Sequence, residues 1–325
     1  RRQRQMCIRD RIYKPETRQF LLSRIAGSEQ ETDMSVPSNC DGFGRIHHFR
    51  RNVDKWVQDP LPNDPVCKAL EIPYTDVLEA QVFQIASCNA HCWYCFVPDE
   101  LKRGKMVNAK WLTAEQMVEL YKKSDTDIRV IDLSGGNPEL APEWTLDTMK
   151  ALERNELQNK VYLWTDDTLT TDYAFEYLSK EELSYMASYR NFGKVGCFKG
   201  FDAHSFAFNS KLPENMYEKQ FERFERYVDM GLDIYGYVTL TSDNYDGIEE
   251  KMGKFVDRLQ KIHPILPLRT VPLKIFIFTP TGSRLNDRYS MALENQTRAI
   301  KAWKVELSKR YSKEQLAGRI SDNTY

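Results

Sequence analysis

The sequence predicts an α/β fold, a partial (β/α)6 TIM-like barrel with an N-terminal extension and a C-terminal helix. From about residue 77, apolar runs of five to ten residues alternate with amphipathic segments of twelve to twenty residues, and six such pairs follow one another. Right-handed crossovers would bring the six strands into one parallel sheet, whereas a complete barrel needs eight. A doubly wound open sheet is the alternative arrangement of the same units.

The composition is that of a folded protein with a substantial core. Of 325 residues, 41% are hydrophobic, and 46 Lys and Arg stand against 47 Asp and Glu. This balance argues against disorder and gives no electrostatic support for general nucleic acid binding. No run approaches the roughly 18 uncharged apolar residues of a membrane span, so we expect a cytoplasmic protein that does not bind membranes.

The first eleven residues, RRQRQMCIRDR, carry five arginines and one acid without periodicity. They resemble a transposase-type sequencing adapter translated in frame, and we expect residues 1–11 to be foreign to the natural protein. A genuine basic tail is the alternative. Without this segment Cys7 drops out of the cysteine count, and 41 Lys and Arg face 46 Asp and Glu, a net charge of −5.

Residues 12–76 are predicted to form an irregular extension wrapped on the larger domain, because Pro, Asn and Asp gather around residues 59–65. The glycines, histidines and arginines of residues 42–51 could hold an anionic group, or form a solvated turn. Cys40 and Cys67 have no C-x-x-C spacing and give little support for a second cluster.

The barrel is predicted over residues 77–282, and residues 283–325 are predicted to be helical. Strands are expected at residues 79–86, 130–133, 161–165, 195–198, 234–240 and 273–278. The first helix should begin after Thr113, a plausible N-cap with Gln116 at the capping-box position. Later helices are expected at residues 143–154, 172–188, 214–230, 245–262 and 290–312.

Three cysteines, Cys88, Cys92 and Cys95, follow the first predicted strand within eight residues. Thiolates spaced this closely can converge on one metal centre, and they are the ligands that iron–sulfur clusters use. Three of them leave one iron of a cubane cluster without a protein ligand. The alternative is a structural zinc with His91 or a distant cysteine as the fourth ligand.

The second predicted strand ends in a glycine turn, Ser134, Gly135, Gly136 and Asn137, followed by Pro138. Glycines allow the backbone to approach a ligand closely. A loop rich in thiols and a turn rich in glycine therefore follow consecutive strands, whose carboxyl ends should meet at one edge of the sheet.

These motifs resemble the radical S-adenosylmethionine (SAM) superfamily. The C-x3-C-x2-C spacing, Tyr94 before the third cysteine and the position after the first strand match its cluster loop, and residues 134–138 are similar to its Gly-Gly-Glu-Pro turn, with Asn137 in place of Glu. The resemblance implies a [4Fe–4S] cluster on the three cysteines and SAM on the fourth iron. The backbone of the turn would bind the methionine amino group.

The resemblance also implies the reaction. Reductive cleavage of SAM would give a 5′-deoxyadenosyl radical that abstracts hydrogen from a small-molecule or peptide substrate, with a flavodoxin- or ferredoxin-like electron donor. Within the superfamily, Asp167, Thr168 and Lys199 partly match the third and fourth strands of glycyl-radical activating enzymes. An activating enzyme for a glycyl-radical protein is therefore an alternative function, and a zinc-stabilised binding module is the non-enzymatic one.

The strand alternation predicts which side chains face the barrel lumen. In residues 233–241 the hydroxyl side chains alternate with apolar ones, so Tyr235 and Tyr237 should face inward as candidate catalytic groups. Cys197 shares a face with Lys199 and could donate a hydrogen atom to a product radical. Ordinary core positions are the alternative for all three candidates, and His204 is a weaker candidate.

Overall fold

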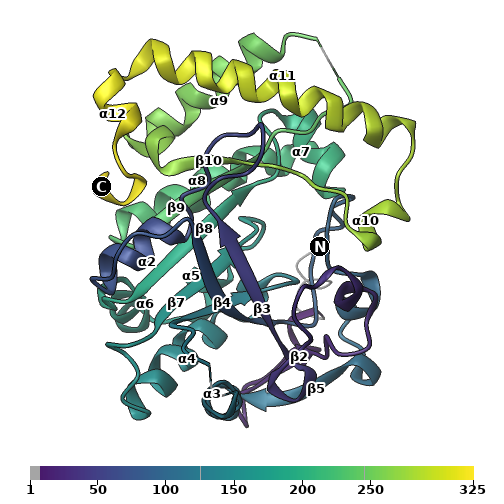
Figure 1. The fold of residues 1–325 in the computed structure, drawn as a ribbon, viewed down its shortest axis with the longest axis vertical. Helices are drawn as coiled ribbons and strands as arrows, with labels where there is room; N and C mark the ends of the chain where they lie inside the picture. Colours follow the sequence, from purple (N-terminus) through teal and green to yellow (C-terminus); the bar gives the residue numbers. More distant parts are fainter. Residues whose placement is uncertain (1–7, 125, 245) are drawn as a thin grey trace.

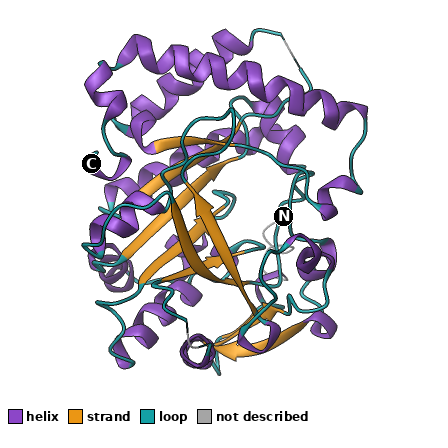
Figure 2. Ribbon diagram, in the orientation of Figure 1, coloured by secondary structure: helices purple, strands orange, loops and turns teal. Residues whose placement is uncertain are grey.

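The computed structural model describes residues 8–124, 126–244 and 246–325, and it confirms the α/β half-barrel (Figures 1 and 2). In these residues a curled seven-stranded sheet has the order β10-β9-β8-β7-β6-β4-β3. The six parallel strands are β4 (Val77–Gln84), β6 (Val130–Ser134), β7 (Tyr162–Asp167), β8 (Phe192–Phe198), β9 (Ile234–Thr239) and β10 (Thr270–Leu273). The antiparallel edge strand is β3 (Gly44–Arg50).

Helices cover the outside of the sheet, as Figure 2 shows. The larger ones are α3 (Ala114–Lys123), α4 (Glu143–Arg154), α6 (Lys180–Ser188), α7 (Ala203–Ser210), α8 (Tyr217–Asp229), α9 (Ile248–Ile262) and α11 (Asp287–Arg310). Short ones are α2 (Asn63–Ala69), α5 (Tyr173–Tyr177), α10 (Thr279–Gly282) and α12 (Lys313–Ala317). The expected capping box is present: Thr113 Oγ1 accepts from the Gln116 backbone at 3.2 Å, and Gln116 Oε1 accepts from the Thr113 backbone at 2.9 Å.

Two of the predicted elements differ most from the structure, whereas the boundaries of the others agree within three residues. The last strand lies at Thr270–Leu273 rather than at 273–278, because its partner β9 ends at Thr239, opposite Leu273, and offers no further backbone groups. The helix expected over 172–188 is two helices, because Leu178 is extended and Ser179 starts α6 with its own capping box. Tyr245, where another helix was expected to begin, lies outside the described residues.

The extension is more regular than predicted. Its β3 joins the main sheet, and β1 (Tyr13–Lys14) and β2 (Gln19–Ser23) form a second sheet with β5 (Ala109–Thr113). The prediction of irregular structure is wrong for these strands. In β3 the residues that face the sheet interior are partly polar, so the usual alternation of apolar and polar residues is not visible in the sequence. Residues 1–7, with Cys7, lie outside the described residues. Arg9 Nη1 donates to Glu143 at 2.9 Å, and the foreign origin of residues 1–11 stays a prediction.

The core has an outer and an inner part. Outside the sheet, Phe198 packs against Phe221 and Phe224 of α8, with ring centroids 5.2 and 5.3 Å apart. Inside the lumen, Trp164 and Tyr235 pack with other apolar residues of the strands and the extension. Each buried large side chain contributes about 1.5–3 kcal/mol. The amino-terminal end of the lumen is therefore filled, and polar chemistry is left to the carboxyl end.

The extension also bridges the open side of the half-barrel. After β3, the chain crosses to the opposite edge strand (Figure 1), where Trp56 Nε1 donates to the Pro272 carbonyl at 2.9 Å. Lys274 Nζ donates to the Asp54 carbonyl at 2.8 Å. The two edges of the sheet are thus joined by the extension, which wraps on the larger domain as expected.

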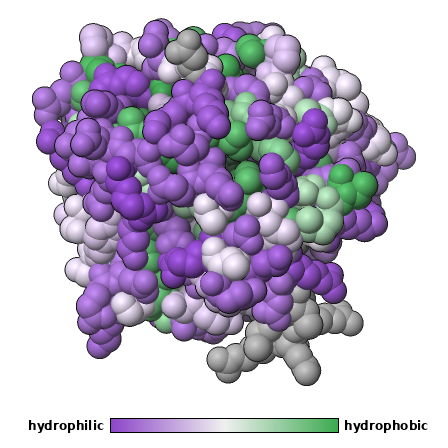
Figure 3. Space-filling model, turned by 90° about the horizontal axis from the view of Figure 1, so that it is seen from below, coloured by the Kyte–Doolittle hydropathy of each residue, from purple (hydrophilic) through white to green (hydrophobic). Residues whose placement is uncertain are grey.

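The surface seen in Figure 3 is mainly hydrophilic, with scattered apolar areas. Among the described residues, no helix combines the length and apolar character needed to cross a membrane.

Candidate active site

The three cysteines lie on one loop at the carboxyl end of β4. All three are partly exposed. Burial, reinforced by the neighbouring thiols of Cys92 and Cys95, raises the pKa of the Cys88 thiol to about 12. The thiols are thus close enough to interact electrostatically, as a shared metal centre requires.

The donor set fits an anionic cluster. Burial lowers the pKa of Lys102, but the thiols of Cys95 and Cys88 outweigh it and raise the pKa above its ordinary value. In the described part of the chain no three His, Cys, Asp or Glu side chains are arranged around a single ion. Three cysteine thiolates on one loop are the ligands that iron–sulfur clusters use. His91, a candidate zinc ligand, is exposed.

The glycine turn touches the chain just before Cys88. Gly136 has φ of +62°, and a Cβ there would lie 2.2 Å from the Ser87 carbonyl oxygen. Gly135 has φ of +57°, and its Cβ would lie 2.5 Å from Gln84 Cγ. The Asn137 backbone donates to the same Ser87 carbonyl at 2.8 Å. Glycine is therefore required at Gly136, where the two motifs meet.

Asn137, which stands where the family turn has Glu, points into this junction. Its Nδ2 donates to Asn89 Oδ1 at 2.9 Å, and its Oδ1 accepts from the Glu139 backbone at 3.3 Å. Thr170 Oγ1 also donates to Asn89, at 3.1 Å. The side chain is fully buried and ties the turn to the cysteine loop.

The predicted inward faces of β8 and β9 are confirmed. Thr239 Oγ1 lies 3.0 Å from the Tyr94 hydroxyl, which joins β9 to the cysteine loop. Burial opposes the charge of Lys199, but Tyr94, Cys197 and then Cys92 raise its pKa well above the ordinary value. Cys197 packs against the inner cluster, and Lys199 lies within electrostatic reach of Cys197 and Cys92, in agreement with the shared face that their spacing predicted.

Asp167 faces outward, contrary to its predicted role beside the cofactor. Its Oδ2 lies 3.6 Å from Lys194 Nζ, on the side covered by helices, and its Oδ1 accepts from the Leu169 backbone at 2.6 Å. The inward carboxylate is Asp166, which accepts from the Ser134 hydroxyl at 2.7 Å. The alternation from Trp164 could have identified it. Thr168 is hydrogen-bonded to Thr170 at 2.6 Å.

The two tyrosines of β9 lie at different depths. Tyr235 stands near the amino-terminal end of the strand, away from the cysteines, where its hydroxyl donates to Asp233 at 3.2 Å and Arg269 lies 3.9 Å from its ring. Tyr237 is one layer nearer the cysteines, and its hydroxyl contacts both Asp59 carboxylate oxygens at 2.9 Å. The structure therefore gives Tyr235 a core position.

Three further charged residues lie in the lumen: Asp59 and Asp132, which were not candidates from sequence, and Arg45, which was considered only as part of a segment. Burial raises the pKa of Asp59 to about 7, against hydrogen bonds from Leu61 and Tyr237. Burial lowers the pKa of Arg45 to about 10, against the attraction of Asp132 and Asp166. Arg45 lies in the segment 42–51 that was flagged for anion binding, and Asp132 shares the face of Ser134, so alternation was the available signal.

The remaining candidates lie elsewhere. Cys40 packs in the outer core and Cys67 lies on α2, so the structure does not support a second cluster on this pair of residues. His204 Nε2 is 2.7 Å from Asp243, with 44% of the histidine side chain exposed.

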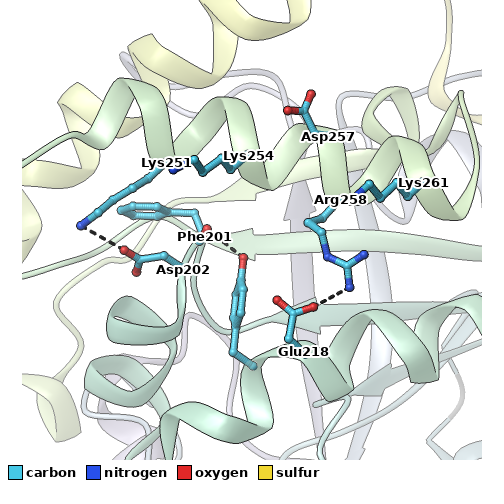
Figure 4. A pocket seen from close by; sticks show the side chains of 9 residues that line it. Phe201, Asp202, Glu218, Lys251, Lys254, Asp257, Arg258 and Lys261 are labelled. Atoms are coloured by element: carbon cyan, nitrogen blue, oxygen red, sulfur yellow. Dashed lines mark hydrogen bonds and ion pairs between the residues drawn. The ribbon is translucent and has the colours of Figure 1, made fainter.

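Two hollows open on the outer surface. One lies between α8 and α9 (Figure 4), where Lys251 pairs with Asp202 at 3.1 Å and Arg258 pairs with Glu218. The other reaches Cys92 and is lined by His91, Trp93, Asp99, Lys211, Arg284, Asn286 and Tyr289. The second hollow therefore gives solvent a route to the outer side of the cysteine loop.

Comparison with known proteins gives one family match. The family model of the radical SAM superfamily matches residues 84–254, more than half of the chain. No curated protein sequence matches. Among solved structures, Streptococcus suis SuiB bound to precursor peptide SuiA is 15% identical, with a TM-score of 0.40, over 56% of this chain and 36% of that chain. The anSMEcpe structure with bound AdoMet is 14% identical, with a TM-score of 0.38, over 57% and 49%. The matched region thus spans about half or less of each solved chain.

Proposed function

The chain belongs to the radical SAM superfamily and is an enzyme of that type, and we propose that Cys88, Cys92 and Cys95 hold a [4Fe–4S] cluster. The observation that carries this proposal is the contact between the two motifs: the chain entering the cysteine loop lies directly against Gly136. A cofactor bound to both would sit at the carboxyl end of the half-barrel, above the lumen.

SAM would be held by groups that surround this point. The backbone of Gly135 and Gly136 would receive the methionine amino group, and Lys199 would pair with the carboxylate. When bound, the cluster and SAM supply reductive cleavage to methionine and a 5′-deoxyadenosyl radical that abstracts hydrogen. The residues of the lumen then orient the substrate and limit the access of water.

Cys197 suits a role as a hydrogen-atom donor. It faces the lumen beside Lys199 and is partly exposed there. Burial raises the pKa of its thiol to about 12, although Lys199 opposes the shift, so the S–H bond is retained at neutral pH. Tyr237 would position the extension through Asp59 rather than act on substrate, and Tyr235 would pack in the core rather than act in the reaction.

A small-molecule or peptide substrate is favoured over a glycyl-radical protein. The extension bridges the two edges of the sheet through Trp56, which restricts the side entrance that a large partner would use. The resemblance to glycyl-radical activating enzymes also loses one of its three residues, because Asp167 turns away from the lumen towards Lys194.

The test is production of 5′-deoxyadenosine by anaerobically reconstituted protein with SAM and a strong reductant, measured by mass spectrometry. Wild type and Cys67→Ala should both form the product, whereas Cys92→Ala should form none. Zinc without iron in the purified and reconstituted protein, or equal product from Cys92→Ala, would overturn the proposal.

An electron donor of the flavodoxin or ferredoxin type would approach from the hollow beside Cys92. Arg284 Nη1 donates to the Cys95 carbonyl at 2.7 Å, and Lys211 is exposed at the rim. These cations are complementary to an acidic carrier, and the hollow offers a short route to the cluster loop.

A further inference from the structure

We infer that the lumen binds a substrate through a cationic group, an amine or guanidinium, held between Asp132 and Asp166. This inference rests on the proposed function and names the substrate class of the same site. It concerns the layer of side chains below the cysteine loop, which the cofactor roles above do not use.

The two carboxylates face one space from neighbouring strands. Asp132 lies two residues before Ser134 on β6 and therefore on the same inner face, one layer deeper. Asp166 on β7 accepts from the Ser134 hydroxyl at 2.7 Å and remains partly exposed to solvent. Asp132 pairs with Trp164 across the two strands, so Asp166, two residues further along β7 on the same inner face, lies close to Asp132. The charge of Asp166 also raises the pKa of Asp132, after burial.

Polar atoms in this layer lack partners. Asp132 is 3% exposed, and its Oδ1 has no hydrogen-bond partner among the described residues. Gln84, on the inner face of β4 and opposite Ser134, is completely buried, and both its amide oxygen and its amide nitrogen are unpaired there. Buried polar groups are rarely left unsatisfied, and each costs about 1–3 kcal/mol. A bound ligand would supply the missing partners.

The nearby cations do not fill this role. Arg45 attracts both carboxylates, but in the described part of the chain it forms no ion pair within 4.0 Å, and its Nη1 lies 3.2 Å from His47 Nδ1. Lys199 is assigned to the carboxylate of SAM. A ligand cation between Asp132 and Asp166 would instead form charge-assisted hydrogen bonds with both.

The surroundings also suggest the shape of the substrate. Trp164 and Val195 form an apolar surface on the same inner face. A cation anchored at Asp132 would therefore carry an aliphatic chain along this surface and direct its C–H bonds upward to the cysteine loop. Lysine and arginine side chains have this form, whereas an acidic side chain would be repelled.

The experiment measures binding of four probes to the reconstituted, SAM-loaded enzyme by calorimetry. The probes are the N-acetyl methylamides of lysine, arginine, norleucine and glutamate. We expect lysine or arginine to bind at least tenfold more tightly than norleucine, and glutamate to bind least. Asp132→Asn should lose at least tenfold of that preference, Asp166→Asn should behave similarly, and the exposed Asp229→Asn should retain it.

Equal affinities for lysine, arginine and norleucine in wild type would overturn the inference. So would an Asp132→Asn variant that binds SAM more weakly while its preference among the probes is unchanged, because the carboxylates would then serve the cofactor. The two proposals fail separately: wild type that forms 5′-deoxyadenosine but shows no preference for cations refutes only the substrate class, and absence of iron refutes the proposed function.

Discussion

Gly136 is the residue at which the glycine turn and the cysteine loop meet. A side chain there would need a positive φ and would collide with backbone, which cannot move as a flexible side chain can. Gly136→Ala should lower the free energy of unfolding of the apoprotein by about 2–4 kcal/mol and reduce bound iron. Chemical denaturation and iron analysis measure the two effects.

Gly231→Ala is the matched control. Gly231 also has a positive φ, +77°, but nothing lies within 4 Å of its Cβ position. The Gly231→Ala variant should lose only the part of the unfolding free energy that comes from the positive φ, about 1–2 kcal/mol, and should keep its iron. Equal losses in both variants would show that the contact with Ser87 is unimportant.

Asp59 gives a pH-dependent stability. In the folded chain the Asp59 carboxyl has a pKa of about 7, against an ordinary value of 3.8. The protonated carboxyl therefore stabilises the folded state fully at low pH, and this stabilisation is lost as the pH rises to 7. The difference in unfolding free energy between Asp59→Asn and wild type should therefore shift in favour of the variant by at least about 1 kcal/mol when the pH is raised from 4.5 to 8. Urea denaturation across this range measures the difference, and parallel stability curves would contradict it.

Sequence could predict those residues of the site that belong to local patterns. Cys88 and its two partners form a motif, and Lys199 and Cys197 follow from strand alternation. Asp59 comes from a segment without periodicity and reaches Tyr237 only through tertiary contact. Asp167 was chosen over Asp166 from a motif, although alternation from Trp164 favours the latter.

At the scale of elements, a buried charge pair joins β8 to the turn after β6. Lys194 pairs with Glu139, and both side chains are almost completely buried. Lys194→Met would leave Glu139 without its counter-charge, at a cost of about 3–5 kcal/mol in unfolding free energy. Lys254→Met, which breaks an exposed pair with Glu250, should cost at most about 0.5 kcal/mol.

The double variant Lys194→Met with Glu139→Gln should recover only part of the loss, because it removes the Glu139 charge but leaves Asp167, 3.6 Å from Lys194 Nζ in the wild type, without its cation. Thermal or chemical denaturation of the three variants decides the matter. A Lys194→Met variant as stable as Lys254→Met would contradict the buried pairing.

Elements with strong periodicity or a cap were predictable, and those defined by a partner strand were not. The helix at Glu143–Arg154 agrees at both ends with its expected range. Edge strands are harder: β10 ends where β9 ends, and β3 has a polar inner face that hides its alternation. Local sequence carries no record of where a neighbouring strand stops.

At the scale of the whole molecule, electron delivery should depend on charge. The rate at which a reduced acidic flavodoxin reduces the cluster should fall with ionic strength, because Lys211 and Arg284 outnumber the one acid, Asp99, that lines the hollow at Cys92. Lys211→Glu should slow it about three- to tenfold, whereas Lys254→Glu, on the exposed face of α9, should have little effect. Stopped-flow absorbance measures the rate, and equal effects of both variants would place the donor elsewhere.

The cysteine loop is expected to leave one iron of the cluster open beside the glycine turn. The most direct test is the electron paramagnetic resonance spectrum of the reduced, reconstituted protein before and after addition of SAM. A [4Fe–4S] signal whose g-values change on addition of SAM is the expected result. A full cluster whose spectrum does not respond to saturating SAM would contradict an open iron at this site.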